Sequence, residues 1–281
     1  GRLVAGFPVG SSQDVNFAYG MNPATFRDRY YEAERLIIEA WTNPEVFAFD
    51  GKYNQIRYVN IWPRPIQQPH PPVWIPGGGS IETWGWCLEK SYLYAYLSYS
   101  GFKRGKLVMD GFWKKADELR ALVMIHPNGF TQADRLSCFY FNNVIGNPLD
   151  TTVALHYLIV DGVLERHPDL KILAVHGGGY LPAYSGRIDH AWGARSDSHG
   201  DLPQPPTSYL KKIYFDTVVF TPYQLAELVR QFGTDRIIMG TDYPFDMADF
   251  DPIGHVASVE GFDPATIAAI AGGNARRLLG L

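Results

Sequence analysis

The chain has 281 residues, 46% of them hydrophobic and 19% charged, and this composition excludes a disordered protein. Its net charge of −4 gives no electrostatic case for binding nucleic acid or an anionic membrane surface. With Cys87 and Cys138 as the only cysteines, a disulfide framework is excluded and a reducing, cytoplasmic compartment is expected. No apolar run reaches the roughly 18 residues of a membrane-spanning helix. The chain begins on Gly1 and reads like the middle of a domain, so we expect a piece of a longer protein.

The first hundred residues predict short strands, helices and long loops. An apolar run at 3–9 predicts a strand, and a helix is expected from Pro23, behind Asn22 as its N-cap, to Asn43. The Pro-rich stretch 47–72 predicts a loop or a short hairpin. After it, PPVWIPGGGS predicts a strand that runs into three glycines, followed by a helix (IETWGWCLEK) and a strand (SYLYAYLSY).

The second half alternates strands and helices more clearly. Short apolar runs predict strands at 121–125, 171–175, 212–215 and 236–239. Helical spacing and capping residues predict helices between and after them, at 151–167, 221–233 and 263–273. Repeated β-α units of this kind imply a parallel sheet, either open or closed into a barrel.

A titratable side chain follows each of these four strands, at or just after its carboxyl end. These side chains are His126, His176, Asp216 and Asp242. In α/β barrels the catalytic groups come from the carboxyl ends of several strands, so the pattern predicts an active-site rim. Imidazole and carboxylate are ordinary ligands of zinc, iron and manganese, and a metal there would polarise a substrate carboxylate or carbonyl.

The motifs HPNGF, HGGGYLPAYSGRIDHAW, YFDT, GTDYPFD and GGNARRLLGL resemble the amidohydrolase-2 family, and within it the aminocarboxymuconate semialdehyde decarboxylase-like proteins. The resemblance runs from about residue 112 to 281 and implies part of a (β/α)8 barrel. It implies that His126 and Asp242 ligate the metal (zinc or manganese), with Asp242 alternatively the base that activates water. It further implies that His176 is the acid/base and that Arg187 binds the substrate carboxylate, often across a dimer interface. We also assign Asn128 to substrate binding.

One part of this family's pattern is absent. Its members open with an H-x-H pair whose two histidines bind metal, and this chain contains no H-x-H. Because zinc sites usually have three or four protein ligands, His126 and Asp242 would need a further ligand. His176 could serve as the third ligand only in a strained arrangement.

Residues 1 to about 110 resemble a different family, the bacterial-luciferase-like flavin monooxygenases. The matching segments are GRLVAGFPVG, RYYEAERLIIEAW, FDGKYN, PRPIQQPHPPVWIPGGGS and SGF…KLVMDGFW. The resemblance implies that Gly78, Gly79 and Ser80 hold the phosphate of flavin mononucleotide, since backbone N–H groups in such a loop can cradle phosphate. A natural fusion, a recombined gene and an assembly artefact would all give this join.

For several of these residues an ordinary structural role competes with a functional one. Asp216 is expected to be structural, because an Asp after a strand often caps loop amides. The three glycines after His176 are expected to let a substrate approach the backbone closely. Arg187 could equally form an ion pair between helices, and His156 is expected in the core.

These observations predict an irregular or hybrid (β/α)8 TIM-type barrel with a luciferase-like part at 1–110 and an amidohydrolase-type part at 111–281. The predicted function is metal-dependent hydrolysis or non-hydrolytic decarboxylation of a small carboxylated aromatic or diene acid. The alternatives are a flavin-dependent monooxygenase and an inactive hybrid without a complete site. The expected partner is a small carboxylate, with no nucleic acid or membrane, and a homodimer is possible.

Overall fold

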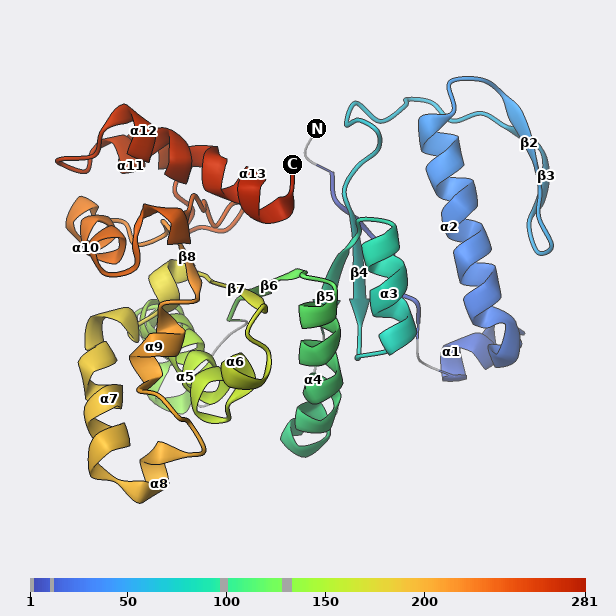
Figure 1. Ribbon diagram of the computed structural model, residues 1–281. Coiled ribbons are helices and arrows are strands. Elements are labelled where there is room, and N and C mark those ends of the chain that lie inside the picture. Colours follow the sequence, from blue (N-terminus) through green and yellow to red (C-terminus); the bar gives the residue numbers. More distant parts are fainter. Residues whose placement is uncertain (1–2, 11–12, 97–100, 128–132) are drawn as a thin grey trace. The chain divides into compact units, whose positions relative to one another are not determined.

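The computed structural model describes residues 3–10, 13–96, 101–127 and 133–281 (Figure 1). The chain divides into two compact units, Gly1–Phe112 and Trp113–Leu281. Within the described residues, the parallel strands form one three-stranded and one four-stranded sheet, and a separate hairpin pairs two further strands. Among the helices described, none is long and apolar enough to cross a membrane.

The first unit contains a small parallel sheet and an antiparallel hairpin. The sheet has the order β1 (Ala5–Gly6), β4 (Val73–Gly77), β5 (Leu93–Tyr96). The Pro-rich stretch expected to be a loop or a hairpin contains a hairpin, formed by β2 (Phe47–Asp50) and β3 (Gln55–Val59).

The helices of this unit are α1 (Gln13–Ala18), α2 (Phe26–Thr42), α3 (Ile81–Glu89) and α4 (Gly101–Glu118), which continues past the boundary of the unit. The side chain of Asn22 accepts a hydrogen bond from the Ala24 amide, but the first turn, η1 (Pro23–Thr25), is a 3-10 turn before α2. The core of the unit gathers Val73, Ile75, Cys87 and Tyr92.

The second unit is built on a parallel sheet in the order β6 (Leu122–Ile125), β7 (Lys171–Ala174), β8 (Tyr214–Asp216), β9 (Ile237–Ile238). All four expected strands are present, but β8 begins two residues later than expected. The cause is the turn after the preceding helix, where the amides of Lys212 and Ile213 donate to the carbonyls of Tyr209 and Leu210.

Helices cover both faces of this sheet, which explains why its strands are continuously apolar. Leu278 of α13 (Asn274–Leu279) packs with Leu173 and Ile238 on one face. On the other face, Phe215 lies 4.6 Å from Phe232 of α10 (Pro222–Phe232), measured between ring centroids. Strands β7, β8 and β9 are therefore largely buried between layers, whereas Met124 of the edge strand β6 is exposed. The strand ends are where polar side chains can gather.

The remaining short elements connect these layers. The helix expected at 151–167 is interrupted at Gly162, where φ is +71°, a backbone conformation that glycine adopts readily. The helix expected at 263–273 begins behind Asp263, as predicted, but its second half is a π-helical turn. These elements are η2 (Ala133–Leu136), η3 (Asn142–Gly146), α5 (Asn147–Val160), α6 (Val163–Arg166), η4 (His176–Gly178), η5 (Pro182–Tyr184), α7 (Ser185–Ala194), α8 (Ser196–His199), α9 (Pro206–Leu210), η6 (Thr234–Arg236), α11 (Pro252–Ala257), α12 (Pro264–Ala268) and η7 (Ala269–Gly273).

Candidate metal centre

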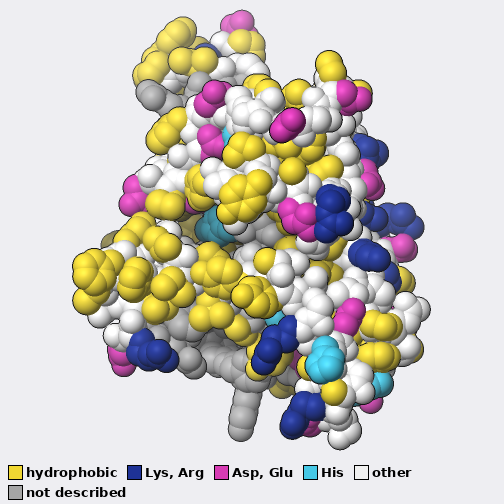
Figure 2. Space-filling model, turned by 90° about the vertical axis from the view of Figure 1, so that its left-hand side faces the viewer, with side chains coloured by type: hydrophobic (Ala, Val, Ile, Leu, Met, Phe, Trp, Pro, Cys, Tyr) yellow, Lys and Arg dark blue, Asp and Glu magenta, His cyan; other side chains and the backbone are white. Residues whose placement is uncertain are grey.

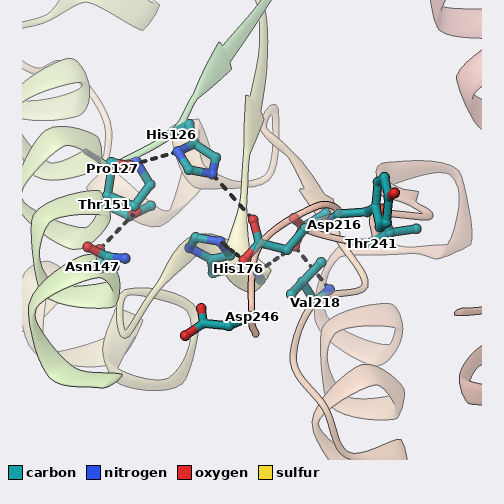
Figure 3. A network of polar contacts seen from close by, with 12 residues as sticks. His126, Pro127, Asn147, Thr151, His176, Asp216, Val218, Thr241 and Asp246 are labelled. Carbon is teal, nitrogen blue, oxygen red and sulfur yellow. Dashed lines mark hydrogen bonds and ion pairs between the residues drawn. The ribbon is translucent and has the colours of Figure 1, made fainter. Parts of the chain in front are cut away.

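Three of the four strand-end residues meet in one cluster at the carboxyl ends of the second sheet. His126 follows β6, His176 follows β7 and Asp242 lies four residues after β9. The Nε2 atom of His126 is 3.6 Å from Oδ1 of Asp242, and Nε2 of His176 is 3.7 Å from Oδ2. Figure 3 shows the two labelled imidazoles side by side, with ring centroids 5.3 Å apart. Each oxygen of one carboxylate therefore faces a different histidine.

The orientation of His126 is fixed from its other ring nitrogen. Its Nδ1 lies 2.7 Å from the carbonyl oxygen of Pro127, and a carbonyl can only accept a hydrogen bond (Figure 3). The Nδ1 atom therefore carries the proton in the neutral ring, and Nε2 presents a lone pair toward Asp242. A second hydrogen bond of this kind is what orients histidine ligands in metal sites.

His176 and Asp242 are both held in a backbone conformation that side chains other than glycine rarely adopt. Each has φ of +54°. Such conformations cost on the order of 1–3 kcal/mol each and persist where the surrounding structure imposes them. Because two members of one cluster adopt this conformation, the surrounding structure must stabilise their backbones, and it thereby fixes where these side chains lie.

Asp216, the fourth strand-end residue, is 5% exposed and does not join the cluster. Its Oδ1 accepts hydrogen bonds from the amides of Gly177, at 2.8 Å, and Val218, at 3.2 Å. Burial raises the pKa of this carboxyl group. Asp216 thus holds the turn after His176 in place, in agreement with the structural role expected for it.

A neighbouring residue, Thr217, supports the other side of the cluster and was missed in the sequence. Its hydroxyl accepts a hydrogen bond from the Gly240 amide at 3.1 Å and lies 3.3 Å from the Gly240 carbonyl. This contact ties the end of β8 to the segment that leads to Asp242. The motif YFDT placed Thr217 next to a strand end, but nothing in its residue type distinguished it from an ordinary strand residue.

The three glycines after His176 serve internal packing, because a side chain on any of them would meet other parts of the protein. All three have positive φ. A Cβ at Gly177 would lie 2.4 Å from Cγ1 of Val219, and one at Gly178 would lie 2.7 Å from Cε1 of Phe215. At Gly179 a Cβ would lie 2.3 Å from the carbonyl oxygen of Pro148. The position that a Cβ would take at each glycine is already filled by the protein itself.

One aromatic side chain, Phe245, lies close to the cluster, and others of this unit are exposed. The ring of Phe245 lies 6.4 Å from that of His126, and Tyr140 donates a 2.9 Å hydrogen bond to Asp246. Several aromatic side chains of this unit are exposed, among them Phe139, Tyr140, Tyr184, Tyr243 and Phe245. Figure 2 shows hydrophobic side chains gathered on the face of the molecule that lies on the left in Figure 1. An apolar, planar ligand would find matching surface there.

The other residues expected at the site lie elsewhere or outside the described residues. Arg187 is exposed on α7, and within the described part of the chain no hydrogen bond or ion pair ties it to the cluster. Asn128 lies outside the described residues. His156, expected in the core, is half-buried in α5 with Nδ1 2.7 Å from the carbonyl oxygen of Thr152.

The glycine loop of the first unit is occupied by its own side chains. The Gly79 amide donates to the Tyr94 hydroxyl at 2.9 Å, and a Cβ at Gly79 would lie 2.3 Å from Cγ1 of Val108. The Ser80 hydroxyl lies 3.4 Å from an Arg27 nitrogen. The amide of Gly79 is therefore already used, and the phosphate cradle expected from Gly78, Gly79 and Ser80 would have to displace this contact.

The donor set of the cluster fits a divalent metal ion. Ligand atoms of His126, His176 and Asp242 all lie within 4.8 Å of one another. Ligands bound tetrahedrally at ~2.1 Å from a zinc ion are ~3.4 Å apart, close to the two His–Asp distances of 3.6 and 3.7 Å. The free lone pair on Nε2 of His126 meets the same requirement, because a metal binds the unprotonated nitrogen.

Comparison with known proteins gives two family matches along the chain. The amidohydrolase family model matches residues 89–281, and the luciferase-like monooxygenase model matches the shorter stretch 1–84. The amidohydrolase match begins earlier than the residue 112 expected from the motifs, so it includes β5 and α4. The shorter match does not by itself support a bound flavin.

The similar curated proteins are decarboxylases. The 2-amino-3-carboxymuconate-6-semialdehyde decarboxylase of Dictyostelium discoideum is 34% identical over 170 residues, covering 60% of this chain and 47% of that protein. The gamma-resorcylate decarboxylase of Rhodococcus jostii is 28% identical, covering 56% of this chain and 47% of that protein. The chain thus spans about half the length of the curated relatives it matches.

Solved structures show the same α/β barrel fold. A 2,6-dihydroxybenzoate decarboxylase from Rhizobium superposes with a TM-score of 0.64 at 21% identity, over 75% of this chain and 71% of that one. A dihydroxybenzoic acid decarboxylase from Polaromonas, with bound manganese and 2-nitroresorcinol, has a TM-score of 0.64 at 17% identity, over 99% and 96%. Since the family match covers well over half of its residues, the chain belongs to the amidohydrolase family.

Proposed function

We propose that the chain is a metal-dependent, non-hydrolytic decarboxylase of small hydroxylated aromatic carboxylates such as 2,6-dihydroxybenzoate. The two curated relatives described above are decarboxylases by name, and one solved relative is a decarboxylase complexed with 2,6-dihydroxybenzoate. The observation that carries the proposal is the cluster itself, in which two imidazoles face the two oxygens of the Asp242 carboxylate.

His126 and Asp242 are the proposed metal ligands, and zinc and manganese are the candidate ions. Nε2 of His126 and Oδ1 of Asp242 face one another, and the hydrogen bond to Pro127 places the proton of the neutral ring on Nδ1. A divalent ion supplies positive charge that holds and polarises the substrate's carboxylate and hydroxyl oxygens. Two protein ligands are fewer than the three usual for catalytic zinc, so we expect weak binding that a chelator reverses.

His176 is the proposed proton donor. Its Nε2 faces the second Asp242 oxygen at 3.7 Å. In the reaction, the bond between the ring carbon and the carboxylate breaks and carbon dioxide leaves. The electron pair stays on the ring carbon, which then takes a proton from the His176 imidazolium, and His176 regains a proton from solvent. Such general acids typically contribute about 10²–10⁴-fold in rate.

The substrate ring is proposed to lie against the apolar surface near the cluster, where Phe245 is close to His126. Arg187 is the proposed clamp for the substrate carboxylate, supplied by a second copy of the chain. Its exposed position on α7 supports this, because an Arg at an exposed position is free to reach a neighbouring molecule. Asn128 is proposed as a further substrate contact.

The test measures metal content and decarboxylation on the same preparations. Zinc or manganese is added to the chelator-treated protein, bound metal is determined, and release of carbon dioxide from 2,6-dihydroxybenzoate is followed. We expect activity that requires added metal. His126→Ala and Asp242→Ala should lose both metal and activity, whereas His176→Ala should keep the metal and lose about 10²–10⁴-fold in kcat.

His190→Ala is the matched control, because His190 is exposed on α7 and has no contact with the cluster among the described residues. It should leave both readouts unchanged. Metal binding without decarboxylation of any hydroxylated benzoate would refute the proposed reaction. Loss of metal in His176→Ala would make His176 a third ligand and would refute its role as proton donor.

A further inference from the structure

A further imidazole–carboxylate pair joins the loop that follows Asp242 to helix α11, and neither partner belongs to the cluster. Nδ1 of His255, on α11, is 3.2 Å from Oδ2 of Asp249. The two side chains are 9% and 14% exposed, respectively. A pair buried to this extent is much less screened by water than a surface ion pair, so it holds its geometry more firmly.

Asp249 connects this pair to the residue that precedes Asp242. Its backbone amide donates a 2.8 Å hydrogen bond to the carbonyl of Thr241, and its Oδ1 accepts one from the Asp251 amide at 2.9 Å. The bond to Thr241 closes the segment 241–249 into a loop whose two ends are joined. The position of Asp249 thereby fixes the carbonyl immediately before Asp242.

Asp242 depends on such support because its backbone is strained. With φ at +54°, its conformation is sparsely populated and costs on the order of 1–3 kcal/mol unless neighbours impose it. Inside the loop, the Phe245 amide donates to the Asp242 carbonyl at 3.0 Å. The contact from Asp249 to Thr241 restrains the other side of Asp242, so both flanks of the strained residue are held by hydrogen bonds.

Helix capping does not account for the pair. A surface hollow of about 460 Å³, with Phe220, Ala248 and Phe250 in its walls, borders Asp249 and His255. The N-terminus of α11 is already capped, because the Asp251 side chain accepts from the Gly254 amide at 3.0 Å. Nε2 of His255 has no hydrogen-bond partner among the described residues, which makes burial of this ring costly.

We propose that His255 is a positioning residue for the metal centre, which acts through Asp249 and Thr241 to hold the carboxylate of Asp242 in its strained position. The inference rests on the proposed role of Asp242 as a metal ligand. It assigns a role to a histidine that no motif of the sequence singled out. Residues that orient metal ligands typically change metal affinity about 10–100-fold when they are removed.

The experiment compares metal affinity in four variants of the full chain, by calorimetric titration with Mn²⁺ or Zn²⁺ in the absence of substrate. His255→Leu removes the donor to Asp249 and should weaken binding about 10–100-fold. His255→Asn and His255→Gln form a matched pair, because Asn places its amide near the position of Nδ1 and Gln places it near Nε2. Asn should retain the affinity and Gln should lose it.

Ser258→Ala is the control for a general effect on α11, since the Ser258 hydroxyl donates to the His255 carbonyl and does not touch Asp249. It should change the thermal midpoint alone. A purely structural role of His255 would lower the thermal midpoint of the Leu variant without changing metal affinity, and this result would overturn the proposal. If His255→Leu does not fold, equal affinities of the Asn and Gln variants would overturn it instead.

The proposed function and the inference about His255 can be refuted separately, because one is tested by decarboxylation and the other by metal affinity. If the unaltered chain binds metal but does not decarboxylate, the proposed function is refuted while the inference about His255 is still decided by the affinities. If the unaltered chain binds no metal at all, both are refuted. If His255→Leu binds as tightly as the unaltered chain, the inference falls and the proposed function stands.

Discussion

Replacing Gly179 by Ala should destabilise the second unit severely, although the substitution adds a single methyl group. The new Cβ would lie 2.3 Å from the carbonyl oxygen of Pro148 and 2.7 Å from Oγ1 of Thr152, and φ at this position is +66°. A left-handed backbone costs a side chain about 1–2 kcal/mol. Overpacking adds about 1–3 kcal/mol, and the contact with a backbone atom cannot be relieved by a rotamer change. We expect a loss of about 2–5 kcal/mol in the free energy of unfolding.

The assay is urea unfolding of the full chain, with Gly193→Ala as the matched control. Gly193 lies inside α7, and a Cβ there would meet nothing within 4 Å. Because Ala favours a helix over Gly, this variant should gain up to about 1 kcal/mol. A loss below about 1 kcal/mol in Gly179→Ala would refute the packing argument and would restore the idea that the glycines leave room for a ligand.

The remaining predictions concern the clamp, the core and one helix cap. If Arg187 acts on the site of a second copy, equal amounts of Arg187→Ala and Asp242→Ala, mixed under conditions that allow subunit exchange, should recover about one quarter of the sites. No recovery in spite of exchange would contradict the proposal. Leu225 of α10 is 0% exposed, so Leu225→Ala should lower the free energy of unfolding by about 2–5 kcal/mol. A smaller loss in urea unfolding would show that the surrounding side chains can close the cavity. Hydrogen bonds from Thr266 lower the pKa of Asp263 below 3.8. The stabilisation by this charged cap is therefore fully present above that value and is lost as the pH falls toward the lowered pKa. In Asp263→Asn the free energy of unfolding should depend less on pH below about pH 4. The same pH dependence in both proteins below about pH 4 would contradict this.

The sequence predicted which strand ends would carry the site, because strand order and polar residues at strand ends are both local features. His126, His176 and Asp242 each follow a short apolar run, and parallel strands bring their carboxyl ends to one edge of a sheet. Asp216 satisfied the same criterion but was expected to be structural, and its carboxylate is taken by backbone amides. Residue type and position therefore predicted that these three side chains lie together, whereas their roles came from the family resemblance and stay predictions.

The supporting contacts could not be predicted because they depend on backbone geometry in irregular segments. The left-handed conformations of His176 and Asp242 leave no trace in residue type, since neither is glycine. The same holds for Asp249 and His255, because Asp249 lies in an irregular segment before α11 and neither the helical nor the strand period applies across it. The three glycines were noticed, but sequence alone did not reveal whether protein or ligand atoms fill the space beside them.

The second unit by itself contains the described cluster and its supports. His126, His176 and Asp242, together with Asp216 and the pair formed by Asp249 and His255, lie within Trp113–Leu281. The absence of an H-x-H motif therefore changes the number of ligands available to a metal, but not the geometry of those that are present. Because affinity falls with ligand number, the cost should be found in weak metal binding rather than in a misplaced proton donor. A metal titration measures the affinity, and kcat at saturating metal measures the proton donor. We expect the metal affinity to be lower than in a site with a full set of ligands, and kcat at saturating metal to be unchanged.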